Sequence, residues 1–229
     1  MKKGFTLAEV LITLGIIGIV AALTIPNLIG NYEKYITVVK LKRAYSIISQ
    51  VVERAIADYG DIKNWDKQYN GEKTDPENYF NKYWKPYVKI TKSCVDRSVK
   101  NNVKYKSFGY KEPFPLYGGA WLSLTGTQNS ENLRIYTGID FITIDNILIH
   151  VGEDDNIIVD INGPSGPNRA GRDAFWFSID KSQNKVIPLT YYMGEKECGT
   201  IKSNTKGGGY TCADKIMKDG WTIKDDYPW

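Results

Sequence analysis

The longest apolar stretch of the chain lies at its N-terminus. From Phe5 to Ile25, 21 residues include a single charged side chain, Glu9. A helix of this length is about 31 Å long, which matches the hydrocarbon core of a bilayer. The pattern therefore predicts a membrane-spanning helix. A carboxylate in such a segment costs about 2.5–3.5 kcal/mol to insert, so Glu9 is expected to have a partner.

A second helical pattern follows this apolar stretch. Pro26, which has no N–H to donate, is expected to kink or loosen the helix, and Gly30 adds to this. Helical periodicity then resumes near Asn31, and apolar residues recur every three or four positions until Gly60 stops the pattern. The members of this stripe are Leu41, Tyr45, Ile48, Val52, Ala55 or Ile56, and Tyr59. A continuous helix over 5–59 would be apolar all round in its first half and apolar on one face in its second half.

The remaining sequence changes from irregular to β-rich. Residues 61–119 contain several prolines, and we expect only one short helix there, capped by Asp75 with Pro76 at its first position. Alternating and β-branched segments predict strands at 121–125, 141–151, 156–161, 175–179 and 186–189, and a short helix at 213–218. Segment 141–151 fits one strand or a hairpin that turns at Asp145–Asn146. Because no helical pattern separates the strands, we expect an antiparallel sheet with the long helix on one face.

The first residues carry a compact motif. Lys2 and Lys3 precede Gly4, and Phe5, Thr6, Leu7 and Glu9 follow it. These residues resemble the leader of type IV pilins and type II secretion pseudopilins, in which a basic leader ends in Gly before Phe and T-L-x-E. The resemblance implies that a prepilin peptidase cuts after Gly4 and that the new N-terminal Phe5 is N-methylated. An ordinary signal peptide has a shorter apolar core and would not explain Glu9.

The same resemblance implies a fold and a function. The fold class would be α+β and pilin-like: leader 1–4, transmembrane and spine helix 5–59, and a β-rich globular domain 60–229. The chain would be a structural subunit of a type II secretion pseudopilus or a type IV pilus, between which the sequence does not decide. Glu9 would pair with the Phe5 amino group of a neighbouring subunit during assembly. The alternative is a minor pilin or adhesin whose C-terminal domain binds a glycan, a surface or DNA.

Location and partners follow from the resemblance and from charge. Lys2 and Lys3 favour an N-terminus in the cytoplasm, so the single-pass chain would place its globular domain in the periplasm and later join the filament. Its expected partners are other subunits, bound through the N-terminal helix, the prepilin peptidase and an inner-membrane assembly platform. The formal net charge is only +4, with acids interspersed among the bases, so nucleic-acid binding is not expected.

Enzyme chemistry is not expected either. The one histidine, His150, lies in a strong strand pattern, where a packed or surface role is more common than catalysis. No Ser-His-Asp, Cys-His or zinc-like spacing is visible, and no phosphate-binding glycine motif joins a strand to a helix.

Three cysteines predict one disulfide in an extracytoplasmic domain. Cys198 and Cys212 enclose a glycine-rich loop and are the favoured pair, and closing a loop of this size is worth about 3 kcal/mol in the chain-entropy account. A bond from Cys94 to either of the other two remains open.

One loop is a candidate cation site. Asp160 and Asn162 lie two residues apart in a Gly- and Pro-rich turn, and Asp173 can close back on them. Ca²⁺ prefers six to eight oxygen ligands from such loops, and major pseudopilins carry a calcium site in their C-terminal region. The loop lacks the EF-hand spacing and its final Glu. The competing interpretation is that the three side chains cap backbone N–H groups. No other cofactor is expected.

Overall fold

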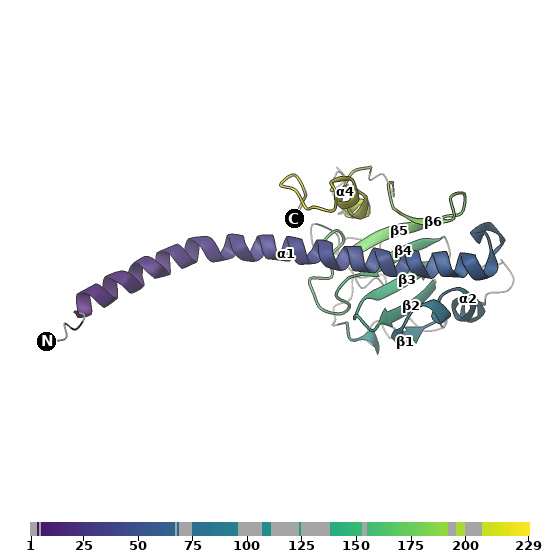
Figure 1. Cartoon of the computed structure of the whole chain (residues 1–229), viewed down its shortest axis with the longest axis horizontal. Helices are drawn as coiled ribbons and strands as arrows, with labels where there is room; N and C mark the ends of the chain where they lie inside the picture. The colour runs from purple at the N-terminus through teal and green to yellow at the C-terminus, as the bar shows by residue number, and fades with distance from the viewer. Residues whose placement is uncertain are drawn as a thin grey trace. The chain divides into compact units, whose positions relative to one another are not determined.

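The computed structural model describes residues 4, 6–66, 68, 75–95, 107–110, 124, 138–152, 155–191, 196–199 and 208–229. The chain divides into an N-terminal unit, Met1–Ile36, and a second unit, Thr37–Trp229. Helix α1 (Leu7–Tyr59) contributes residues to both units (Figure 1).

The N-terminal unit presents exposed apolar side chains along α1. Its exposed large aliphatic residues run from Leu7 to Ile29 along α1, and the exposed Tyr32 and Tyr35 follow them. Among the described residues, α1 is the helix that is long and apolar enough to cross a membrane. Helix α1 continues through Pro26 and Gly30, so helical structure is not interrupted before Asn31. The kink or loosening that we expected at Pro26 stays a prediction. Pro26 removes only the helical partner of the Ala22 carbonyl, a cost that a long helix can tolerate.

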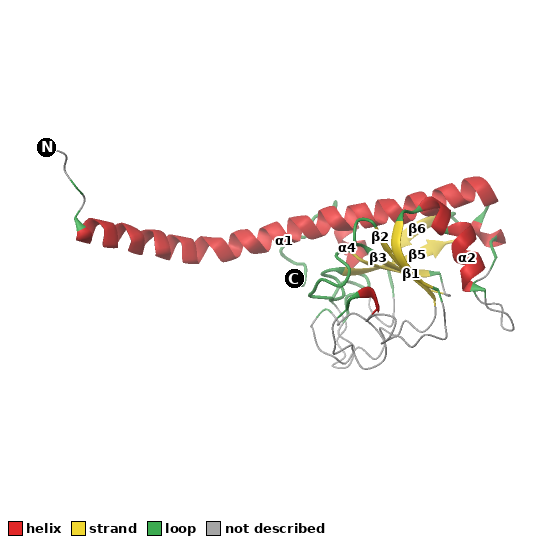
Figure 2. Cartoon of the chain, turned by 90° about the horizontal axis from the view of Figure 1, so that it is seen from below, coloured by secondary structure: helices red, strands yellow, loops and turns green. Residues whose placement is uncertain are grey.

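The second unit begins with the part of α1 that has one buried face. The buried side chains recur every three or four residues, as the apolar stripe predicts. They are Val38, Leu41, Ala44, Ile48, Val51, Val52 and Ala55. Tyr45 and Ile56 lie partly buried beside them, whereas Tyr59 is exposed. This face packs against one side of a β-sheet, as Figure 2 shows.

The described part of the chain forms a six-stranded sheet in which every strand is antiparallel to the preceding one. The strands are β1 (Ile90–Cys94), β2 (Gly138–Thr143), β3 (Leu148–Gly152), β4 (Asn156–Asp160), β5 (Ala174–Asp180) and β6 (Lys185–Pro188). Their spatial order is the order in sequence, so the sheet is a meander. The predicted α+β architecture, a long N-terminal helix followed by an antiparallel sheet, is confirmed.

Most predicted strands are confirmed within one to three residues at each end. The segment 141–151 is a hairpin, with β2 and β3 joined at Asp145–Asn146, and Asn146 has a φ of 59°. The strand predicted at 121–125 lies outside the described residues except for Leu124, which is buried in a turn. β1 was not predicted, because its sequence ITKSC has only two apolar residues and its middle is exposed.

Both faces of the sheet are buried, not only the face under α1. Ile139, Phe141, Ile149 and Phe175 belong to the core that α1 completes. On the opposite face a second apolar cluster joins strand residues to side chains from three other segments. Its members are Phe108, Tyr110, Ile142, Leu148, Ile158, Ala170, Ala174, Trp176 and Tyr210. This second cluster explains why β2 and β3 are buried along their whole length.

Short helical segments flank the sheet. They are η1 (Ile62–Asn64), α2 (Pro76–Tyr83), η2 (Lys85–Tyr87) and α4 (Cys212–Lys218), so the helices predicted after Asp75 and at 213–218 are confirmed. Asp75 Oδ1 accepts a hydrogen bond of 2.8 Å from the Asn78 backbone N–H, and Pro76 occupies the first helical position.

Replacing Asp75 with alanine should lower the free energy of unfolding by about 1 kcal/mol, because the first turn of α2 loses its side-chain acceptor. Urea unfolding followed by tryptophan fluorescence measures the change. Asn78→Ala is the matched control, since it keeps the backbone N–H that Asp75 accepts from. Equal effects of the two substitutions would contradict the cap.

Candidate functional site

The N-terminal motif contains a hydrogen-bonded pair at the start of α1. Glu9 Oε2 accepts from the Thr6 backbone N–H at 2.8 Å and from Thr6 Oγ1 at 2.8 Å. In return, Thr6 Oγ1 accepts from the Glu9 N–H at 3.3 Å. This reciprocal arrangement is a capping box, which satisfies N–H groups that the first helical turn leaves without partners.

The capping box gives Glu9 a partner within its own chain. We predicted only a partner in a neighbouring subunit, although the spacing T-x-x-E is itself a capping-box signature. Among the described residues, the donors to the Glu9 carboxylate come from Thr6 alone and reach Oε2, so Oε1 can still accept from another group. Gly4 is exposed, and Phe5 lies outside the described residues, so cleavage after Gly4 and methylation of Phe5 stay predictions.

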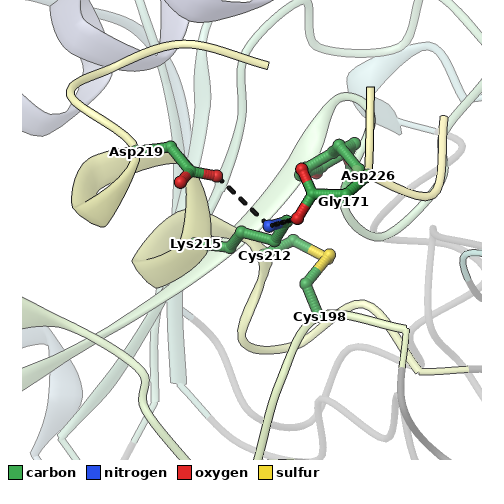
Figure 3. The surroundings of a disulfide bond; sticks show 7 residues. Gly171, Cys198, Cys212, Lys215, Asp219 and Asp226 are labelled. Carbon is green, nitrogen blue, oxygen red and sulfur yellow. Dashed lines mark hydrogen bonds and ion pairs between the residues drawn. A yellow bond between two sulfur atoms is a disulfide. The ribbon is translucent and has the colours of Figure 1, made fainter. Parts of the chain in front are cut away.

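The predicted disulfide between Cys198 and Cys212 is present, with the two Cα atoms 4.5 Å apart (Figure 3). Cys94 lies in β1 and takes no part in it. Gly171 packs directly on the bond, because a Cβ atom at Gly171 would lie 2.8 Å from Cys212 Sγ. The bond therefore joins the start of α4 to the segment at Cys198, and the loop that precedes β5 packs against it at Gly171.

Ion pairs hold the segment after α4 close to that helix. Lys215 Nζ lies 2.6 Å from Asp226 Oδ2 and 3.2 Å from Asp219 Oδ2, and Figure 3 shows it between the two carboxylates. Lys224 Nζ lies 2.8 Å from Asp219 Oδ1. The bond to Asp226 raises the pKa of Lys215, and the bond to Lys224 lowers the pKa of Asp219. The side chains of Lys215 and Asp219 are only 22% and 17% exposed, whereas their partners Asp226 and Lys224 are 67% and 55% exposed. The pairs with these two exposed partners orient the segment more than they stabilise it.

Trp221 attaches the same segment to α1. Its ring centroid lies 5.7 Å from that of Tyr45, and Lys42 Nζ lies 5.6 Å above the indole. Trp221 has a φ of 61°, which is unfavourable for a bulky residue, so its contacts must compensate for backbone strain. The disulfide and Trp221 thus fasten the C-terminal segment at two points.

The loop that we considered for calcium uses its carboxylates as caps. Asp173 Oδ2 accepts from the Asn168 N–H at 2.7 Å, and Asp173 Oδ1 accepts from the Arg169 N–H at 2.5 Å. Asp160 Oδ2 accepts from the Tyr110 hydroxyl at 2.7 Å, and Asn162 Nδ2 donates to the Gly166 carbonyl at 3.2 Å. Among the described residues, no three His, Cys, Asp or Glu side chains are grouped as metal ligands. Asp173 therefore caps two backbone N–H groups, and Asp160 Oδ1 accepts from the Asn162 N–H at 3.3 Å, as the capping interpretation predicts. The Asn162 side chain instead donates to a carbonyl. Calcium binding stays an untested prediction.

Burial raises the pKa of Asp173 to about 6, against the opposing effect of its N–H donors Arg169 and Asn168. A carboxyl group whose pKa is higher in the folded state stabilises that state below its unfolded pKa of about 3.9. This contribution is lost as the pH rises through 6. Between pH 4.5 and 7.5, Asp173 should therefore lower the free energy of unfolding by about 2 kcal/mol.

Urea unfolding of the wild type and of Asp173→Asn at pH 4.5, 6.0 and 7.5 measures this dependence. Relative to the wild type, the variant should become more stable as the pH rises. Asp180→Asn is the control, because hydrogen bonds from Ser182 lower the pKa of Asp180 and its titration falls below this window. A wild-type-to-variant difference that does not change with pH would rule out the raised pKa.

His150 lies inside the sheet, as its strand pattern predicted. It pairs across strands with Asp140, its Nδ1 lies 3.0 Å from Asp140 Oδ1, and only 3% of the residue is exposed. The backbone of Gly138 leaves room for the ring, since a Cβ atom there would lie 2.7 Å from His150 Cε1. This buried pair was not predicted, because nothing in the sequence links the two positions before the hairpin register is known.

Two family models and one curated protein match parts of this chain. Residues 1–25 match the family described as the prokaryotic N-terminal methylation motif, and residues 27–133 match a family of unknown function, DUF6613. The type II secretion system core protein G of Escherichia coli (strain K12) is 52% identical over 33 residues, which make up 14% of this chain and 23% of that protein. The chain therefore matches less than a quarter of that relative's length. No solved structure matches the chain. The chain has the N-terminal segment of the type IV pilin and type II secretion pseudopilin family, and it carries this segment on a pilin-like α+β architecture.

Proposed function

We propose that this protein is a structural subunit of a pseudopilus or type IV pilus that assembles through the N-terminal part of α1. The observation that carries the proposal is the exposed apolar surface of α1 from Leu7 to Ile29, which overlaps the prokaryotic methylation motif at residues 1–25. Apolar residues on all sides of a helix need cover from lipid or from other helices. A membrane before assembly and neighbouring subunits after it provide that cover in turn.

In this proposal, a prepilin peptidase removes Met1–Gly4, and Phe5 becomes the methylated N-terminus. The N-terminus faces the cytoplasm and the second unit faces the periplasm, in agreement with the charges of Lys2 and Lys3. Assembly also requires an inner-membrane platform that extracts the subunit from the bilayer. The similarity to a type II secretion protein favours the pseudopilus over the pilus.

Glu9 has a defined task in this assembly. Its Oε1 atom is available beside the capping box, and it is well placed to accept from the Phe5 ammonium group of the next subunit. A buried carboxylate next to a cation is tolerated, whereas an unpaired one is not. The pair between Glu9 and the neighbouring Phe5 would thus favour incorporation of subunits that bind in the correct register.

Intact mass of the full chain, purified from membranes with and without a co-expressed prepilin peptidase, tests the proposal. The peptidase should remove Met1–Gly4 and leave one added methyl group. Retention of the first four residues, or cleavage within 21–24, would refute processing as a prepilin.

A further inference from the structure

The exposed apolar surface of α1 extends beyond Ile25, the last residue of the apolar stretch Phe5–Ile25. Leu28 and Ile29 follow Pro26 on the same unbroken helix and are 70% and 51% exposed. The 20 residues from Val10 to Ile29 contain no charged side chain. A helix of this length spans about 30 Å, the thickness of the hydrocarbon core.

Two registers of the helix in the bilayer can be compared. With Phe5–Ile25 in the core, Glu9 lies about 6 Å inside the hydrocarbon, and Leu28 and Ile29 remain in water. With Val10–Ile29 in the core, Glu9 lies outside it, and only the neutral amide of Asn27 enters, about 3 Å deep. A shallow amide is less unfavourable than a deeper carboxylate. The second register takes Leu28 and Ile29 out of water but leaves Phe5 and Leu7 outside the core, so the position of Glu9 is what favours it.

Polar groups suited to a headgroup layer lie at both ends of the Val10–Ile29 segment. At the N-terminal end, the Thr6–Glu9 capping box satisfies the first backbone N–H groups, and water can reach it there. At the other end, Tyr32 and Tyr35 are 63% and 64% exposed, with Lys34 between them. Tyrosine is enriched at the membrane–water interface, and lysine extends its charge towards phosphate.

The distance between these two ends agrees with the bilayer. Thr6 and Tyr35 are separated by about 44 Å along an α-helix, and a bilayer with its headgroup layers is about 40–45 Å thick. Residues three apart on a helix point to the same side, so Tyr32 and Tyr35 present their rings together.

We infer that Val10–Ile29 spans the hydrocarbon core, that Thr6 and Glu9 lie in one phospholipid headgroup layer, and that Tyr32, Lys34 and Tyr35 bind the opposite one. The ligand is the glycerophosphate region of the lipid, which accepts hydrogen bonds from the tyrosine hydroxyls and pairs with Lys34. This inference rests on the proposed insertion of the chain into a membrane. It places Glu9 within reach of the cytoplasm before assembly.

Thiol accessibility in the full chain tests the register. In a Cys94→Ser background, one cysteine at a time is introduced in place of Ala8, Asn27, Ile29, Asn31 or Glu33. Leu11→Cys is the control, because Leu11 lies in the hydrocarbon core in both registers. Membrane vesicles of both orientations are treated with a membrane-impermeant maleimide, which reacts with the thiolate form and therefore only in water. The thiols expected in water should react at least about tenfold faster than those expected in the hydrocarbon core. The fast group is Asn31→Cys and Glu33→Cys in one vesicle orientation and Ala8→Cys in the other. The slow group is Asn27→Cys, Ile29→Cys and Leu11→Cys.

The outcomes separate the register from the insertion itself. If Asn27→Cys and Ile29→Cys react as fast as Glu33→Cys while Ala8→Cys is protected, the helix spans Phe5–Ile25 and our register is wrong. If alkaline carbonate releases the chain from the vesicles, and Leu11→Cys reacts as well, the chain is not inserted, and both this inference and the proposed membrane stage fail.

Discussion

Replacing Glu9 with alanine or leucine should leave the chain in the membrane but reduce filament yield at least about tenfold, because the neighbouring Phe5 ammonium group would lose its counter-charge in a buried site. The measurement is the amount of sheared filament from cells with the complete assembly system, together with subunit levels in the membrane fraction. Glu53→Ala is the matched control, since Glu53 is an exposed glutamate on the same helix. Normal filament yield from Glu9→Ala would overturn the assembly role.

The capping box offers a second explanation for such a defect, and one further variant separates the two. Thr6→Val removes the hydroxyl that accepts from the Glu9 N–H but keeps the Glu9 carboxylate. If Glu9 acts between subunits, Thr6→Val should retain most of the filament yield that Glu9→Ala loses. Equal losses would mean that the cap of α1, and not a pair between subunits, is what assembly requires.

Removing the disulfide should be the largest single destabilisation of the second unit outside its apolar core. With Cys198 and Cys212 both replaced by serine, the free energy of unfolding should fall by about 3 kcal/mol, because the unfolded chain is no longer closed into a loop. For a unit of this size, that loss corresponds to a melting temperature lower by roughly 6–12 °C. Near-ultraviolet circular dichroism of the full chain in detergent follows the transition.

Cys94 provides the matched control for this experiment. Cys94→Ser removes a sulfur atom but no disulfide, and Cys94 is only partly buried, so its effect should be clearly smaller than that of the double variant. Reducing agent should shift the wild type to the melting temperature of the double variant and leave the double variant unchanged. A double variant that melts with the wild type would show that Trp221 and the ion pairs hold the C-terminal segment without the covalent bond.

Local sequence signals predicted much of this fold. The cap at Asp75 with Pro76, the hairpin turn at Asp145–Asn146 and the stripe along α1 depend on neighbouring residues alone. For this reason they could be read without any knowledge of the tertiary structure. The disulfide was likewise favoured because its two cysteines bracket one loop.

Features that depend on distant residues were missed. β1 carries little apolar character of its own and is a strand because β2 pairs with it. The second apolar cluster brings Tyr210 onto the same face of the sheet as Phe108 and Tyr110, which lie about a hundred residues earlier in the sequence. The loop 160–173 was ambiguous because oxygen-rich turns that bind cations and turns that cap N–H groups use the same residue types.

The meander of the sheet has a consequence for the order in which the protein folds. β2 to β6 each pair with a strand that lies next in sequence, so these hairpins can form early and without closing long loops. The contact of Trp221 with Tyr45, in contrast, joins the two ends of the second unit. During synthesis, the buried face of α1 is made before every strand that covers it, and the C-terminal segment that completes this cover is made last. Nascent chains that end before β5 therefore expose the apolar face of α1, which makes them targets for chaperones and for proteolysis.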